Sequence, residues 1–317
     1  MRKAILLAAC AAAVTLAVGS ANAADYPSKP IKIVHGSAAG APQDVMLRRL
    51  AENMKEVAGV PVVVEPRPGG TGQVAIAYLQ NQAADGYTIF SDATGITSVL
   101  QLPGAAYKWT DLTPLYRIQL DPFALYIKRD GKFKDLNGLL AAMKARPDKV
   151  RIGGYGTGSP HQITTLFLGE QAGVKVNWVP YTSGSNAIKA VMGGELDAAM
   201  SNISVYSRFK EKTQVVGVTS ADRLAAFTDT PTFKEQKYDL VRYHWRGMFV
   251  KNGTPKEVLE KLFDIAAKGA NRDDFKEYLA KSSTLSGKMT RAEFMNMLKA
   301  QAENDLKTLK AIGMIKG

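Results

Sequence analysis

Hydrophobic and polar residues follow two patterns along the chain: short apolar runs rich in valine and isoleucine, and longer runs with apolar residues three or four positions apart. Short apolar runs bounded by turn residues predict buried strands, and the longer spacing predicts amphipathic helices. Near the start, strands are predicted at 31–36, 60–66 and 87–92, and helices at 42–59 and within 69–86. This alternation is typical of a parallel sheet with helices on its faces.

The same pattern recurs further along the chain. The elements expected there are strands at 150–155, 176–181, 196–202 and 213–220, helices at 160–173 and 185–194, long extended passages at 115–131 and 241–255, and C-terminal helices at about 255–268, 271–280 and 290–312. We therefore predict an α/β protein of two lobes with parallel or mixed sheets, joined by two crossovers. Lobe 1 is expected to comprise 24–121 and 243–317, and lobe 2 to comprise 122–242.

The first 23 residues have the pattern of a secretory signal peptide. Arg2 and Lys3 give a basic start, the apolar run AILLAACAAAVTLAV follows, and Ala-Asn-Ala at 21–23 is a small-x-small cleavage site. A membrane anchor is the alternative, but the run is short for a spanning helix, which takes about 20 residues. Cleavage before Ala24 and a periplasmic location are therefore expected.

Charge and cysteine content limit the kinds of partner and chemistry that the chain can have. Removing the two basic residues of the predicted signal peptide lowers the formal net charge from +12 to +10. The remaining lysines and arginines are spread along the chain without a basic run interleaved with aromatics, so we expect no nucleic-acid partner and a general preference for anionic small molecules. Cys10 is the sole cysteine, so the mature chain would have neither a thiol nucleophile nor a disulfide.

Glycine- and serine-rich turns connect three predicted strands to the helices that follow them, at HGSAAGAPQD (35–44), GGYGTGSPHQI (153–163) and YTSGSNAIK (181–189). Each would leave backbone N–H groups at a helix N-terminus, which carries a partial positive charge. Ligands of open α/β sheets bind at the carboxyl ends of the strands, where these turns lie. The glycines and serines could simply mark turns, but three such turns favour an anion-binding site.

The common sequence motifs of nucleotide-binding and catalytic sites do not occur in the chain. The chain has no phosphate-binding G-x-x-x-x-G-K-[ST] and no G-x-S-x-G nucleophile elbow. The dinucleotide pattern fails because Gly156 and Gly158 are followed by His161 where the third glycine belongs. The histidines show no short metal-binding spacing. We therefore expect no catalytic residue, no metal and no cofactor, and a carboxylate as the anion.

The three histidines and one arginine are further candidates. His161 falls in the first turn of its predicted helix, where it could donate to a carboxylate or simply pack. His35 ends a strand and is the weaker candidate. His244 lies two residues from Arg246, which could clamp a carboxylate through two hydrogen bonds or form a salt bridge between the lobes.

A series of segments in order, YPSKPIKIV, RPGGTG, ADGYTIF, GSPHQI, VPYTSGSNAIKAVMGGELDAAM, VTSADRL and DTPTFKE, covers nearly the whole mature chain. In these segments the chain resembles the solute-binding proteins of tripartite tricarboxylate transporters, the Bug-type family. The resemblance implies a type II periplasmic binding-protein fold that closes on a small carboxylate and delivers it to the permease subunits in the membrane. It also implies a monomer.

In that family the carboxylate is held by the turn after the first strand and by the Gly-Ser-Pro turn of the second lobe, partly through backbone N–H groups and water. The ligand-binding residues expected here are Ser37, Ala38, Ala39, Gly40, Gln43, Thr94, Thr157, Gly158, Ser159, His161, Tyr181, Ser201 and Arg246. The first turn lacks the hydroxyls of the usual family pattern. Ser201 stands where the family often has an acidic residue, which disfavours a ligand amino group and favours a di- or aromatic carboxylate.

Two other functions remain open from the sequence. A sensory partner that binds the same ligand and docks to a signalling receptor would have the same pattern. An exported enzyme built on the same lobes would need a nucleophile–base pair in the cleft, and no recognisable spacing provides one.

Overall fold

The computed structural model describes residues 25–316, and the predicted signal peptide lies outside them. Strands occur at every predicted position. They are β1 (Ile31–His35), β2 (Val62–Pro66), β3 (Thr88–Ala93), β4 (Leu112–Lys128), β5 (Arg151–Tyr155), β6 (Asn177–Tyr181), β7 (Ala198–Asn202), β8 (Thr213–Val218), β9 (Tyr243–Lys251) and β10 (Leu285–Ser286). Ten strands of this part of the chain form one mixed sheet in the order β2-β1-β3-β9-β4-β7-β5-β6, with β8 and β10 paired to β4.

The helices confirm the predicted periodicity. They are α1 (Pro42–Ala58), α2 (Gln73–Gln80), α3 (Ile96–Val99), α4 (Leu136–Ala145), α5 (Pro160–Ala172), α6 (Gly184–Gly193), α7 (Lys256–Ala270), α8 (Asp273–Lys281) and α9 (Arg291–Ala311). Helix α4 was not predicted. Its N-cap Asp135 accepts a hydrogen bond from the Gly138 N–H at 2.7 Å, and it buries Leu136, Leu139 and Met143, so a capped apolar face specifies it.

The hydrophobic cores separate the chain into two parts. Two clusters of buried side chains draw only on residues up to 120 and from 245 onward, around β1, β3 and the packed helices α1 and α7. Two others draw only on residues 123 to 240. We call these two parts of the chain lobe 1 and lobe 2, and the lobe boundaries themselves stay a prediction.

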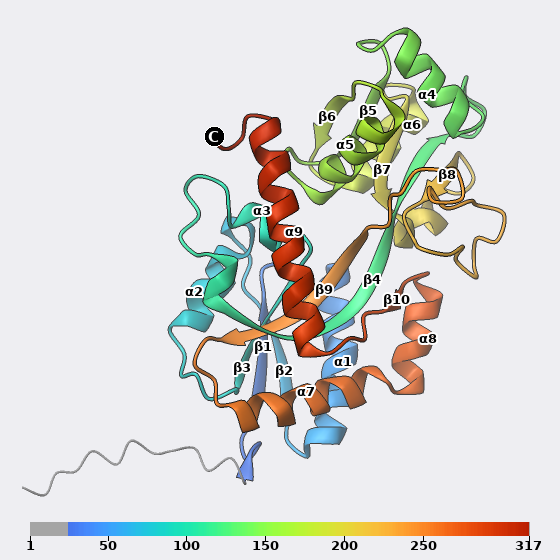
Figure 1. Ribbon diagram of the computed structural model, residues 1–317. Coiled ribbons are helices and arrows are strands. Elements are labelled where there is room, and N and C mark those ends of the chain that lie inside the picture. The colour runs from blue at the N-terminus through green and yellow to red at the C-terminus, as the bar shows by residue number, and fades with distance from the viewer. Residues whose placement is uncertain (1–24, 317) are drawn as a thin grey trace, which may run out of the picture.

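Strands β4 and β9 run between the lobes (Figure 1). They pair antiparallel along nine residue positions, and β4 continues into lobe 2, where it pairs with β7 and β8. The two extended passages of the sequence are therefore these crossovers. A buried polar cluster ties them, because Arg246 Nη1 donates to Gln119 Oε1 at 2.8 Å and lies 3.7 Å from Asp121 Oδ2.

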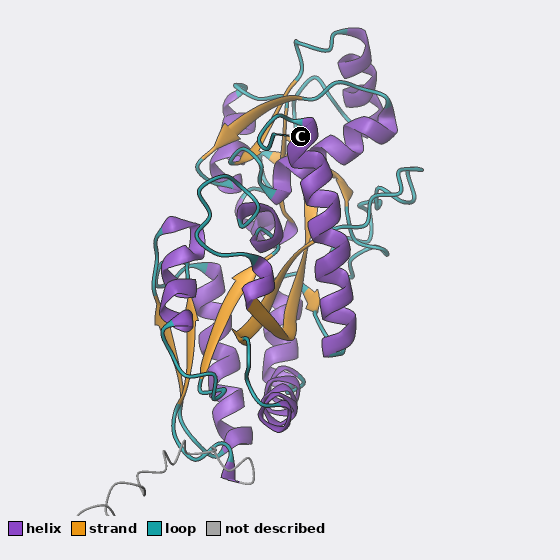
Figure 2. Ribbon diagram, turned by 60° about the vertical axis from the view of Figure 1, so that its left-hand side comes forward, coloured by secondary structure: helices purple, strands orange, loops and turns teal. Residues whose placement is uncertain are grey.

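Helix α9 returns from lobe 1 to the side of lobe 2, where its end lies beside α5 (Figures 1 and 2). Phe167 of α5 and Thr308 of α9 line the same surface hollow. Asp305, buried on α9, accepts a hydrogen bond from Thr97 Oγ1 at 2.6 Å and lies 3.5 Å from Arg242. The helix thus joins α3 to the segment that leads into β9. No helix of the described residues is long and apolar enough to cross a membrane.

Candidate ligand-binding site

A cavity of about 420 Å³ lies between the two lobes, at the carboxyl ends of β1, β3 and β5. Lobe 1 contributes the turn after β1, the turn before α2, the end of β3 and helix α3. Lobe 2 contributes the turn after β5 and the start of α5. Position and size are those of a small-molecule site in an open α/β protein.

The first turn is held from beneath by a buried hydrogen-bond network. His35 Nε2 bonds Asp44 Oδ1 at 3.0 Å, and the His35 Nδ1 accepts from the Ser37 N–H at 3.3 Å. Arg48 Nε and the Gly40 N–H both donate to Asp44 Oδ2 at 2.9 Å. Burial raises the pKa of Asp44, but the hydrogen bonds from Arg48, Gly40 and His35 outweigh it and bring that pKa to about 2. The network shapes the turn and is not itself part of the cavity lining.

At the start of α1 no side chain caps the helix, and Pro42 occupies the first helical position, as the sequence predicts. Ser37 Oγ donates to Gln43 Oε1 at 2.9 Å, and Gln43 Nε2 donates to Ser91 Oγ at 3.3 Å. Ser37 and Gln43 both line the cavity. The uncapped helix therefore presents its N-terminus beside two side chains that are already oriented by hydrogen bonds.

The second turn ends in a serine cap. Ser159 is the N-cap of α5, its Oγ accepts from the Gln162 N–H at 3.3 Å, and Pro160 follows. The Gln162 side chain reaches back to the Gly158 N–H at 2.6 Å, one residue earlier than in a capping box. Gly156 and Gly158 have φ of 51° and 70°, a conformation that only glycine adopts without strain. Both glycines line the cavity, so this turn places its backbone at the cavity surface.

Two histidines lie at the lobe 2 side of the cavity. His161 and His244 both line it, with ring centroids 6.2 Å apart. His161 Nε2 bonds Asn202 Oδ1 at 3.2 Å, and the Nδ1 atoms of both histidines are buried without a partner among the described residues. Burial lowers the pKa of His161 to about 4 and that of His244 well below its ordinary value, so both rings are neutral at pH 7.

Sequence reasoning missed Asp92, which lines the cavity from the end of β3. Its Oδ1 accepts from the N–H of Ala93 at 2.8 Å. Burial raises the pKa of this carboxyl to about 7, against the single opposing hydrogen bond from Ala93. The predicted strand 87–92 ends at this residue, so the rule that ligands lie at strand carboxyl ends could have found it.

An apolar wall completes the cavity. Ile96, Val99, Leu100 and Leu102 line it from α3 and the turn that follows, and Pro160 lines it from lobe 2. Apolar side chains with a few convergent polar groups are the usual lining of a site for a small organic molecule.

Six of the thirteen residues expected at the ligand line the cavity, namely Ser37, Gln43, Thr157, Gly158, Ser159 and His161. The seven that do not line it are Ala38, Ala39, Gly40, Thr94, Tyr181, Ser201 and Arg246. The structure thus brings residues of the first and second turns together at one cavity. Residues 38–40 of the first turn are exposed instead.

The polar residues outside the lining have other partners. Thr94 Oγ1 donates to the Tyr243 carbonyl at 3.0 Å and joins β3 to β9. Tyr181 Oη lies 3.5 Å from Glu195, and Arg246 belongs to the crossover cluster with Gln119. Ser201 is buried beside Gly184, where a Cβ would come within 2.3 Å of its hydroxyl.

The third predicted turn also lies outside the cavity lining. Ser183 caps α6 by accepting from the Asn186 N–H at 3.1 Å, as expected of a capping serine. No residue of 182–189 contributes to the cavity lining. Among the described residues, no group of His, Cys, Asp or Glu side chains could hold a metal ion.

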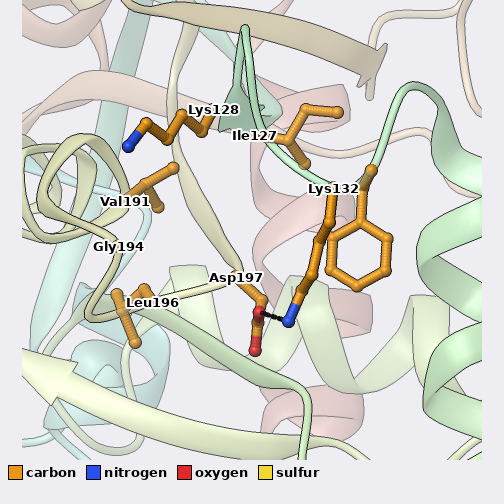
Figure 3. Close-up of a pocket in the computed structure, with 9 residues that line it drawn as sticks. Ile127, Lys128, Lys132, Val191, Gly194, Leu196 and Asp197 are labelled. Carbon is orange, nitrogen blue, oxygen red and sulfur yellow. Dashed lines mark ion pairs between the residues drawn. The ribbon is translucent and has the colours of Figure 1, made fainter.

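A second hollow of about 210 Å³ lies in lobe 2, away from this cavity (Figure 3). Lys132 Nζ points to Asp197 Oδ1 and pairs with it at 2.7 Å. Lys128 lines it as well, but every lining residue belongs to lobe 2, so this hollow is not a site on which the two lobes could close.

Comparison with known proteins fits this geometry. The family model described as tripartite tricarboxylate transporter family receptor matches residues 46–314. The chain belongs to this family. It is 27% identical to the UPF0065 protein in the gbd 5′ region of Cupriavidus necator, over 98% of this chain and 96% of that one.

Solved structures show the same fold. A TctC solute-binding protein from Polaromonas superposes with a TM-score of 0.76 at 25% identity, covering 89% of this receptor and 99% of that chain. R. palustris Rpa4515, solved with adipate, gives a TM-score of 0.77 at 22% identity, covering 91% and 99%. The periplasmic binding-protein fold predicted from the sequence is confirmed, and this receptor is a periplasmic solute-binding protein of the TctC and Bug type.

Proposed function

We propose that this receptor captures a small organic carboxylate between its lobes and delivers it to the membrane permease of a tripartite tricarboxylate transporter. The observation that carries the proposal is the cavity itself, where two helix N-terminal turns, one from each lobe, face a shared volume of about 420 Å³. A helix N-terminus favours negative charge. Charge-assisted hydrogen bonds to a carboxylate, each worth roughly 1.5–3 kcal/mol, would hold the lobes together.

The sequence favours a di- or aromatic carboxylate, and the adipate in the R. palustris protein is a dicarboxylate. The apolar wall of α3 supports a ligand with an apolar body. The proposal also holds that the mature protein starts at Ala24, lies in the periplasm and is a monomer.

We further propose binding without catalysis. Two serine hydroxyls line the cavity, and each donates elsewhere: Ser37 to Gln43 and Ser159 to the Tyr155 carbonyl. Neither bonds a histidine among the described residues, so neither forms the nucleophile–base pair that acyl transfer needs.

Thermal unfolding against a panel of dicarboxylates, tricarboxylates, aromatic acids and amino acids tests the proposal. A ligand at 100 times its dissociation constant adds about 2.7 kcal/mol to the free energy of unfolding, which raises the midpoint by several degrees. We expect a shift with one chemical class. Absence of any shift in protein that native mass spectrometry shows to be ligand-free would contradict the proposal.

Replacing His161 with alanine is expected to weaken binding of the ligand found in that panel at least several-fold. The ring lines the cavity and carries an unpartnered buried nitrogen. Calorimetric titration would measure the effect. Glu170→Ala, an exposed position at the other end of α5, is the matched control and should bind as the parent does. Equal affinities for all three proteins would remove His161 from the site.

A further inference from the structure

The charges around the cavity are unbalanced for a dianionic ligand. Among the described residues that line it, none is a lysine or an arginine, and Asp92 is the only acidic side chain. Both lining histidines are neutral at pH 7, as described above. At pH 7 the Asp92 carboxyl is partly ionised, because its pKa is about 7. A dicarboxylate would therefore bring two negative charges to a cavity that already holds part of a negative charge and offers only the partial positive charge of helix N-termini.

Three arginines of the elements around the site are already engaged. Arg48 is paired with Asp44 beneath the first turn. Arg246 is bonded to Gln119 in the crossover cluster, and Arg242 faces Asp305 on α9. None of the three lines the cavity, so none is placed to balance the Asp92 carboxylate.

Asp92 is placed to contact a ligand. Its Oδ1 is bonded to its neighbour's N–H, and its Oδ2 forms no hydrogen bond or ion pair with any described residue. A Cβ built on Gly72 would lie 3.3 Å from that Oδ2, and one built on Gly36 would lie 2.6 Å from the Gly72 Cα. The carboxylate therefore lies against Gly72, which itself packs on Gly36, and both glycines line the cavity beside it.

We propose that Asp92 determines specificity by accepting a hydrogen bond from an ammonium group of the ligand, so that the site takes an amino-substituted carboxylate in preference to a dicarboxylate. The inference rests on the proposed function and narrows its ligand. The ligand carboxylate lies at the helix N-termini, the ammonium group lies at Asp92, and the apolar wall of α3 packs against the carbon skeleton between them.

In the sequence, Ser201 favoured a ligand without an amino group, because the family often has an acidic residue at that position. The structure supplies a carboxylate from β3 of the opposite lobe. Burial leaves Asp92 short of stabilising partners, as its raised pKa records, and an ammonium group would provide the missing charge-assisted hydrogen bond.

The test uses series of matched size that differ at one end. The aliphatic series is glutarate, 4-aminobutyrate and pentanoate, and the aromatic series is terephthalate, 4-(aminomethyl)benzoate and 4-ethylbenzoate. Each is titrated calorimetrically into the parent protein, into Asp92→Asn and into Asp264→Asn. Asp264 is an exposed carboxylate on α7 that does not line the cavity, so its variant removes the same charge at a distance. All three proteins are unfolded and refolded first to remove carried-over ligand.

In at least one series we expect the amino acid to bind the parent about tenfold or more tightly than the diacid, since one charge-assisted bond is worth that much. Asp92→Asn should reduce or reverse that ratio, and Asp264→Asn should keep it. A diacid or plain acid that binds the parent as well as the amino acid, or a ratio unchanged in Asp92→Asn, would overturn the inference and leave carboxylate binding intact.

A different failure would overturn the proposed function as well. If the ligand-free parent binds none of the acids in these series or in the wider panel, carboxylate capture itself is wrong. Thermal unfolding of Asp92→Asn accompanies the titrations, so a lost fold cannot be mistaken for lost recognition.

Discussion

Replacing Gly36 with alanine is expected to weaken ligand binding about a hundredfold or more and to lower the free energy of unfolding by about 1–3 kcal/mol. The added Cβ would lie 2.6 Å from the Cα of Gly72 and 3.1 Å from its N. Both are backbone atoms, so no side chain can rotate away, and the first turn must separate from the turn before α2. Both turns line the cavity, and their separation would misplace several hydrogen bonds at once.

Gly95→Ala is the matched control, because Gly95 also lines the cavity. It has an ordinary helical φ of −67°, and its nearest neighbours to a Cβ are 3.9 Å away. Calorimetric titration with the tightest panel ligand and urea unfolding would compare the two variants. We expect Gly95→Ala to bind nearly as the parent does. If Gly36→Ala also binds as tightly as the parent, the first turn is not part of the ligand site.

Replacing Asp305 with alanine is expected to lower the free energy of unfolding by about 3 kcal/mol. Its carboxylate faces the Arg242 guanidinium at 3.5 Å and accepts from Thr97 Oγ1 at 2.6 Å. Burial lowers the pKa of Arg242 and raises that of Asp305, so each charge depends on the other. This loss of stability is at the low end of the range for removing one partner of a buried ion pair, because the Arg242 side chain keeps 17% of its surface exposed.

The double variant Arg242→Met/Asp305→Leu is the control for this pair. Removing both charges leaves no unpaired charge, although Thr97 still loses its acceptor, so part of the lost stability should return. Urea unfolding of Arg242→Met, of Asp305→Leu and of the double variant gives the coupling energy. A double variant as unstable as the sum of the two single variants would show that the pair is not coupled.

Local rules account for how well the elements could be predicted from the sequence. Helices and strands depend on residues within a few positions, so the spacing of apolar residues places α1, α5 and α7 within about two residues of their ends. Ser159 and Pro160 mark the start of α5 because capping acts within one turn. Helix α4 was missed although it is as long as α6, which was predicted, and helix α3 was missed because its four residues give no periodic signal.

Contacts between distant residues decide the site, and the sequence cannot show them. Arg246 was a candidate clamp, yet its guanidinium is bonded to Gln119, which is 127 positions away in the chain. Tyr181 and Ser201 sit in motifs of the family, yet the packing of α6 and β7 places them outside the cavity lining. Whether a polar side chain is available to a ligand depends on what else has already bonded it.

The sequence by itself determined the α/β architecture, the long extended passages and the glycine- and serine-rich turns at the starts of α1 and α5, because periodicity and caps are local. Only the tertiary structure decided which charges remain unpaired in the cavity. Pairing removed the arginines from the ligand's reach and left Asp92 without a cation, since the energy of a buried charge is set by neighbours that folding brings together from distant parts of the chain.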